Sequence, residues 1–130
     1  MILVAEDNVM IAMMIEDDLQ DAGHAVAGPV ATIGEALAIA REGGLTMALV
    51  DIDLLYGESG IELAATLKDE HDLPCIFVTG QANEAMNHPD AALGVLAKPF
   101  GPDTIARTVD AVLHEKRPEI AQLTWFDGVA

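Results

Sequence analysis

The sequence predicts an α/β fold in which five parallel strands form one sheet with helices on both faces. Five short apolar runs occur along the chain, and segments with the helical spacing of apolar residues alternate with them. Such strands pair in parallel, because each helix carries the chain back across the sheet. The 130 residues lie within the usual size of one domain, and a hydrophobic content of 52% is enough for a core.

The apolar runs are too short for surface helices and suit strands. The run at 2–5 is uniformly apolar, which is typical of a strand buried on both faces. Gly28 and Pro29 favour an edge position for the second run, and Pro74 is tolerated at the first position of the fourth. The expected strands are ILVA (2–5), HAVAGPV (24–30), MALVD (47–51), PCIFVT (74–79) and GVLA (94–97).

Capping residues and glycines mark the helices between these strands. Asn8 and Thr32 can cap helix N-termini, and Gly23 and Gly43 follow the corresponding helices. Only a short helix is expected in QANEAMNHPDAA, because Pro89 interrupts it. The expected helices run from Asn8 to Gly23, from Thr32 to Gly43, over 61–71, within 81–92, and from Pro102 through Leu113.

Charge and cysteine content narrow the possible partners and location. The net charge of −16 repels a phosphate backbone, so we expect no direct contact with nucleic acid. Cys75 is the single cysteine and cannot form an internal disulfide, which fits a reducing compartment. The start MILVAEDN has neither the pattern of a signal peptide nor that of a membrane span. We therefore expect a cytoplasmic protein.

Polar residues stand where four of the expected strands end. Glu6 and Asp7 follow the first strand, Asp51 ends the third, Thr79 ends the fourth, and Lys98 follows the fifth. Ligands of open parallel sheets bind at the carboxyl ends of the strands, where the winding direction reverses. If the strand order is 2-1-3-4-5, the first and third strands are neighbours at that point. The three acidic residues then lie together, with the threonine and the lysine to one side.

Three converging carboxylates repel one another and call for a cation. Mg²⁺ is the natural choice, because it prefers carboxylate oxygens, keeps several waters and accepts phosphate oxygens. Lys98 would supply a positive charge to a phosphoryl group and Thr79 a hydroxyl donor, which leaves one aspartate free as a nucleophile. The site is therefore predicted to combine carboxylates, magnesium and a phosphorylated group.

These residues resemble the receiver domain of two-component response regulators over residues 1–115, with 116–130 as a C-terminal tail. The resemblance implies a flavodoxin-like, doubly wound sheet of order 2-1-3-4-5. It also implies that a histidine kinase or histidine phosphotransfer protein phosphorylates Asp51 in the presence of Mg²⁺. A cis peptide bond between Lys98 and Pro99 is a further implication. The implied metal ligands are Glu6, Asp7, Asp51 and the carbonyl of Asp53, and the implied phosphate-contacting residues are Thr79 and Lys98.

The sequence also departs from the common receiver pattern. Val95 occupies the position three residues before the lysine, where receivers usually carry an aromatic switch residue. The FVTG and KPF motifs are similar to those of stand-alone receivers that lack this aromatic residue. We therefore expect phosphorylation to act mainly by ordering the backbone of residues 80–92, and the output to proceed by protein contact.

Two other functions fit parts of this pattern. A Mg²⁺-dependent phosphohydrolase could use an aspartyl nucleophile, although such enzymes normally need additional elements to enclose a substrate. A degenerate receiver could act as a binding module only. The tail contains Trp125 and Phe126, which either fold back on the domain or bind a partner. We expect a monomer or a weak homodimer.

Overall fold

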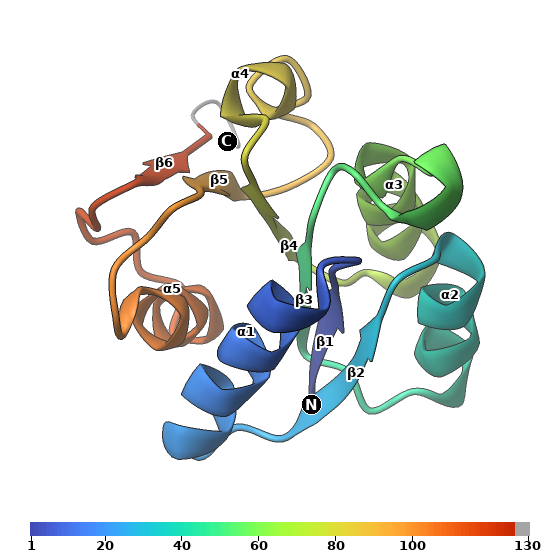
Figure 1. Ribbon diagram of the computed structural model, residues 1–130, viewed down its shortest axis with the longest axis horizontal. Coiled ribbons are helices and arrows are strands. Elements are labelled where there is room, and N and C mark those ends of the chain that lie inside the picture. Colours follow the sequence, from blue (N-terminus) through green and yellow to red (C-terminus); the bar gives the residue numbers. More distant parts are fainter. Residues whose placement is uncertain (127–130) are drawn as a thin grey trace.

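A mixed sheet of six strands runs through the centre of the molecule, in the order β2-β1-β3-β4-β5-β6 (Figure 1). The structure is a computed structural model, and it describes residues 1–126. The strands are β1 (Ile2–Ala5), β2 (Val26–Val30), β3 (Met47–Val50), β4 (Cys75–Thr79), β5 (Gly94–Ala97) and β6 (Leu123–Trp125). The first five are parallel, which confirms the predicted order 2-1-3-4-5.

Helices cover both faces of this sheet, as the alternating pattern predicted. α1 and α5 pack on one face, and α2, α3 and α4 pack on the other (Figure 1). The helices are α1 (Val9–Asp21), α2 (Ile33–Glu42), α3 (Gly60–His71), α4 (Ala82–Ala85) and α5 (Thr104–Leu113), with a 3₁₀ turn η1 (Leu55–Gly57) before α3. Within residues 1–126, no helix has the length and apolar character needed to cross a membrane.

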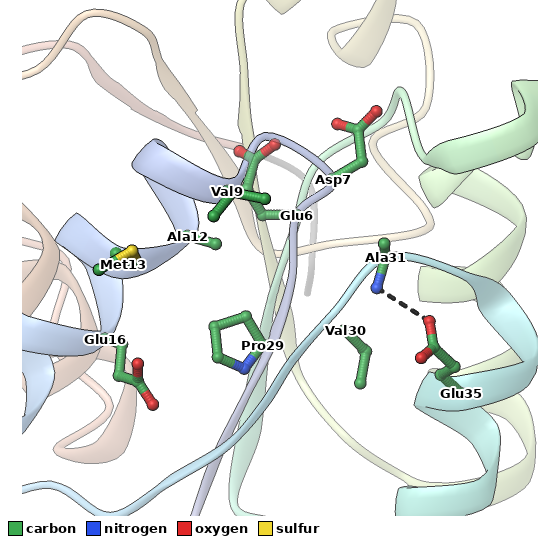
Figure 2. A pocket seen from close by; sticks show the side chains of 10 residues that line it. All are labelled: Glu6, Asp7, Val9, Ala12, Met13, Glu16, Pro29, Val30, Ala31 and Glu35. Atoms are coloured by element: carbon green, nitrogen blue, oxygen red, sulfur yellow. Dashed lines mark hydrogen bonds between the residues drawn. The ribbon is translucent and has the colours of Figure 1, made fainter.

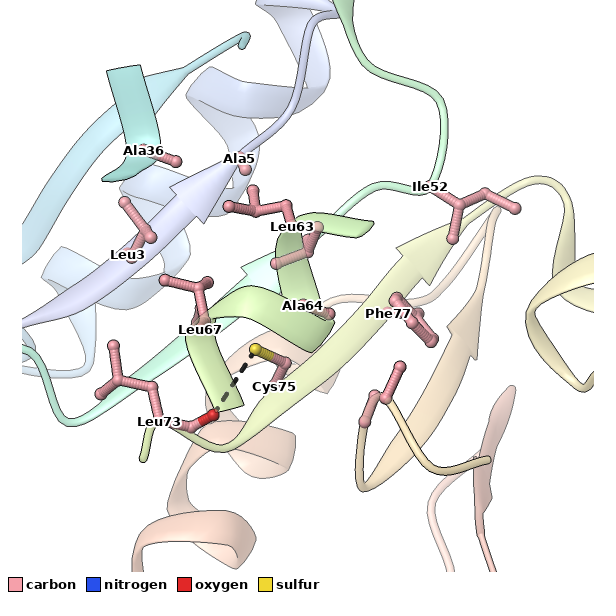
Figure 3. Close-up of a cluster of buried hydrophobic side chains, with 14 of the residues drawn as sticks. Leu3, Ala5, Ala36, Ile52, Leu63, Ala64, Leu67, Leu73, Cys75 and Phe77 are labelled. Carbon is pink, nitrogen blue, oxygen red and sulfur yellow. Dashed lines mark hydrogen bonds between the residues drawn. The ribbon is translucent and has the colours of Figure 1, made fainter. Parts of the chain in front are cut away.

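The central strands are buried on both faces, because alternate side chains enter two different hydrophobic clusters. Leu3 and Ala5 of β1 pack with α2 and α3, whereas Ile2 and Val4 pack with α1 and α5. Figure 3 shows the first cluster, in which Leu3 and Ala5 lie close to side chains of α3. Val95 of β5, the residue that departs from the common receiver pattern, is also buried in this cluster.

Two helix starts depend on the capping residues that the sequence suggested. Asn8 Oδ1 accepts the backbone N–H groups of Met10 and Ile11, both at 3.1 Å. Thr32 Oγ1 accepts the N–H of Glu35 at 3.2 Å, and the Glu35 carboxylate accepts the Thr32 hydroxyl in return. α5, in contrast, begins at Thr104, two residues later than predicted, because Asp103 adopts a positive φ of 64°.

The sixth strand was not predicted, and it corrects the expected sheet of five strands. β6 pairs antiparallel with β5, with Gly94 opposite Trp125 and Leu96 opposite Leu123. Phe126 is 4% exposed and packs in the cluster on the α3 side, while Trp125 packs on the other face. The tail therefore folds back on the domain up to Phe126, which is the first of the two expected alternatives. Residues 127–130 lie outside the described part of the chain.

Candidate functional site

The acidic residues meet because β1 and β3 are neighbouring parallel strands. Ala5 pairs with Val50, and the Asp51 N–H donates to the Ala5 carbonyl at 2.9 Å. The chain that leaves β1 and the chain that leaves β3 therefore start from the same edge of the sheet. Carboxylate oxygens of Glu6, Asp7 and Asp51 all lie within 4.8 Å of one another, and we call these three residues the acidic cluster.

Lys98 reaches the acidic cluster from the end of β5. Its Nζ donates to Glu6 Oε1 at 2.5 Å and to Asp51 Oδ2 at 2.9 Å. The backbone N–H of Lys98 donates to the Thr79 carbonyl at 2.9 Å, which ties this residue to the end of β4. The Lys98–Pro99 peptide bond is cis, as the family resemblance implied. The lysine that the sequence singled out thus faces the acidic residues.

Burial has the larger effect on the pKa of Glu6, whereas hydrogen bonds together have the larger effect on the pKa of Lys98. Glu6 is 4% exposed, and this burial raises the pKa of its carboxyl to about 7, which the hydrogen bond from Lys98 only partly offsets. Burial alone would lower the pKa of the Lys98 ammonium, but its hydrogen bonds to Glu6 and Asp51 outweigh burial and raise that pKa. The ammonium is therefore held in its charged form beside two carboxylates.

Asp51 is held in place by the chain that follows it. The Asp53 N–H donates to Asp51 Oδ1 at 3.2 Å, and the Gly60 N–H donates to the Ile52 carbonyl at 2.8 Å. A Cβ at Gly60 would lie 1.8 Å from the Asp51 carbonyl oxygen, so only glycine lets α3 begin this close to the acidic cluster. The Asp53 side chain is exposed, and its carboxylate is not part of the acidic cluster.

Thr79 lies at the end of β4 and is completely buried. Its Oγ1 accepts the N–H of Gln81 at 2.9 Å, and this bond turns the chain toward α4. A threonine hydroxyl that accepts one hydrogen bond can still donate its own hydrogen. The Lys98 N–H joins Thr79 to Lys98 through the backbone, and within residues 1–126 the Thr79 side chain forms no hydrogen bond with the acidic cluster.

The acidic cluster has the donor set that suits a hard divalent cation. Its three side chains offer only oxygen ligands, which Mg²⁺ prefers, and Lys98 neutralises part of their charge. The residues therefore fit a magnesium ion.

A hollow beside the acidic cluster was not predicted from the sequence. It has a volume of about 290 Å³, lies between α1 and β2, and shares Glu6 and Asp7 with the acidic cluster (Figure 2). Sequence spacing predicted α1 and β2 separately, but the hollow depends on how their side chains meet.

A doubly wound sheet whose acidic loops face the lysine that follows β5 is the arrangement of a CheY-like receiver. The family model for the response regulator receiver domain matches residues 2–110, and the chain belongs to this family. Solved structures agree with this assignment. A CheY-like receiver protein from Methanospirillum hungatei has a TM-score of 0.78 and 29% identity, with 88% of this chain and 93% of that chain covered.

Regulators of the PhyR type are among the similar proteins. The phyllosphere-induced regulator PhyR of Methylorubrum extorquens is 34% identical over 117 residues, covering 86% of this chain and 43% of that protein. The receiver domain of PhyR from Erythrobacter litoralis has a TM-score of 0.77 and 29% identity, with 92% and 94% of the two chains covered. The chain spans less than half the length of the curated relatives it matches.

Proposed function

We propose that Asp51 accepts a phosphoryl group from a histidine kinase or a histidine phosphotransfer protein, in a reaction that requires Mg²⁺. The observation that supports this most strongly is the position of Asp51: its carboxylate is shared between the acidic cluster and the Lys98 ammonium, 2.9 Å away. An anionic nucleophile next to a cation is the arrangement that phosphoryl transfer needs.

The transfer forms one bond and breaks one. An oxygen of the Asp51 carboxylate attacks the phosphorus of a phosphohistidine, and the P–N bond breaks. The electron pair of that bond returns to the imidazole of the donor, which takes up a proton. Glu6, Asp7, Asp51 and the Asp53 carbonyl would hold magnesium, which supplies positive charge to the phosphoryl oxygens when it is bound.

Lys98 and Thr79 act on the phosphoryl group in this proposal. The Lys98 ammonium neutralises charge on the phosphoryl oxygens, and its bond to Asp51 already places it at the reacting carboxylate. The Thr79 hydroxyl donates to the group after a rotation of its side chain or a shift of the 79–81 turn. Both residues would then report phosphorylation to β4 and β5.

The protein would work in the cytoplasm as a monomer or a weak homodimer, and signal to a downstream protein. Because the buried Val95 cannot move like an exposed aromatic switch, the ordering of residues 80–92 carries the signal. That segment holds only four helical residues, in α4. The charge of −16 argues against nucleic acid as the direct target.

The two alternative functions have less support. A phosphohydrolase would need elements that enclose its substrate, and the chain belongs to a family of signalling domains. A degenerate receiver would have lost part of the reactive set, whereas Glu6, Asp7, Asp51, Thr79 and Lys98 are all present.

The test is incubation with acetyl phosphate and Mg²⁺, followed by mass measurement of the intact chain. We expect one labile phosphoryl group, which disappears with Asp51→Asn and with removal of Mg²⁺. Asp69→Asn is the matched control, because Asp69 is an exposed aspartate on α3. Labelling of the Asp51→Asn variant would overturn the proposal. Sustained turnover of small phosphate esters would instead favour the phosphohydrolase.

A further inference from the structure

The hollow between α1 and β2 is a surface feature that phosphoryl transfer does not use. At about 290 Å³ it lies just below the range of about 300–1,000 Å³ that is typical of pockets for drug-sized ligands. It therefore has room for little more than one long side chain of another molecule. Because it shares Glu6 and Asp7 with the acidic cluster, an occupant would lie next to the loop that follows β1.

The walls of the hollow combine apolar side chains with acidic ones. Val9 and Met13 come from α1, and Pro29 and Val30 come from β2 (Figure 2). Val9 is 70% exposed and Met13 is 56% exposed, so their apolar surface faces solvent. Large apolar side chains left uncovered around a concave surface indicate a contact with another molecule. The walls suit an aliphatic chain.

The carboxylates of the hollow differ in whether they already have partners. Glu6 is bonded to Lys98, and Glu35 caps the start of α2. Within residues 1–126, no hydrogen bond or ion pair engages the carboxylates of Asp7 and Glu16, and no basic residue lines the hollow. Asp7 belongs to the acidic cluster, which leaves Glu16 as the acid available to an occupant.

We infer that the hollow receives a lysine or arginine side chain of the protein that delivers the phosphoryl group. Both side chains have an aliphatic stem and a cationic head, which match the apolar walls and Glu16. An anionic head would be repelled by a chain of charge −16, and an apolar head would desolvate Glu16 without a partner.

This inference rests on the proposed function, because a donor protein must approach this edge of the sheet only if Asp51 is the acceptor. A basic residue seated in the hollow would touch the same loop that carries Glu6 and Asp7. It would thereby fix the approach of the donor relative to Asp51 without touching the reacting atoms. We expect it to contribute to the choice of partner.

The test uses the full chain, labelled with ¹⁵N, at low ionic strength and with excess Mg²⁺ to saturate the acidic cluster. n-Butylguanidinium is the probe, and n-butylurea is its neutral counterpart of similar shape. We expect n-butylguanidinium to cause saturable shifts of the Ala12 and Val30 amide signals, and n-butylurea to bind more weakly. The variant Glu16→Lys should weaken the guanidinium about five- to tenfold, and Glu16→Gln should weaken it less.

Asp17→Lys is the matched control, because it makes the same charge change one residue away, at an exposed position outside the hollow. Equal losses with Asp17→Lys and Glu16→Lys would show a general charge effect and overturn the inference. So would equal binding of n-butylurea, or the lack of localised shifts. If the titration fails while acetyl phosphate still labels Asp51, the proposed function stands without this inference. If labelling fails while the titration succeeds, the hollow keeps its preference for cations and the proposed function falls.

Discussion

Replacing Gly94 by alanine should weaken the attachment of β6 to the sheet. Gly94 lies opposite Trp125, and a Cβ at this position would lie 2.6 Å from the Thr124 carbonyl oxygen and 3.2 Å from the Trp125 Cα. Non-bonded carbon atoms pack at about 3.5–4.0 Å, and both contacts are to backbone, which cannot rotate away. Either β5 and β6 separate locally or β6 detaches.

The expected cost follows from these contacts. One extra methyl group in a well-packed region costs about 1–3 kcal/mol. Complete detachment of β6 would cost more, because removing a buried phenylalanine such as Phe126 alone costs about 3–5 kcal/mol. We therefore expect Gly94→Ala to lower the free energy of unfolding by about 1–3 kcal/mol. For a domain of this size this loss corresponds to a decrease in Tm of about 4–11 °C.

Urea denaturation and thermal unfolding measure this loss, and hydrogen exchange locates it. The amide of Phe126, which donates to the Leu93 carbonyl, should lose protection. Gly34→Ala is the matched control. Gly34 lies in α2, and beyond its own helical turn no atom of residues 1–126 lies within 4 Å of the added Cβ. The free energy of unfolding of this variant should stay equal or rise by up to about 1 kcal/mol. If Gly94→Ala is as stable as the parent and Phe126 stays protected, the reasoning is refuted.

Three further predictions concern the core and the site. Burial raises the pKa of the Cys75 thiol from 9.0 to about 12, so the unfolded chain ionises first and stability should fall as pH rises above 9.0; Cys75→Ala should remove this slope in urea titrations. Lys98→Met leaves buried carboxylates without their cation and should cost about 3–5 kcal/mol in the absence of Mg²⁺, whereas the exposed Lys116→Met should cost less than about 1 kcal/mol. Beryllofluoride with Mg²⁺ should slow amide exchange in residues 80–92, and unchanged exchange would rule out ordering of this segment.

The sheet order and the meeting of acidic residues could be predicted because both follow from local patterns. The runs ILVA (2–5) and MALV (47–50) are apolar throughout, and each is followed directly by an acidic residue. The positions of these strands in a doubly wound sheet therefore also predicted where Glu6 and Asp51 lie. Lys98 follows β5 at the same edge of the sheet, which explains why its ammonium contacts both Glu6 and Asp51. The roles of these residues in phosphoryl transfer remain predictions.

β6 and the hollow could not be predicted, because neither has a local signal. β6 is three residues long, and LTW in a tail has no alternation from which a strand can be recognised. β6 can pair with β5 because Gly94 has no side chain that would clash with it, and because Phe126 packs in the hydrophobic cluster on the α3 side of the sheet. The hollow likewise arises where α1 and β2 meet.

The antiparallel sixth strand also bears on how the protein behaves at high concentration. Without it, GVLA of β5 would form the rim of the sheet, an apolar strand open to the backbone of any neighbouring molecule. An exposed apolar edge strand of that kind is a site where β-sheet aggregation can begin. The short final strand takes up those backbone groups within the same chain, so self-association by strand addition has to begin elsewhere.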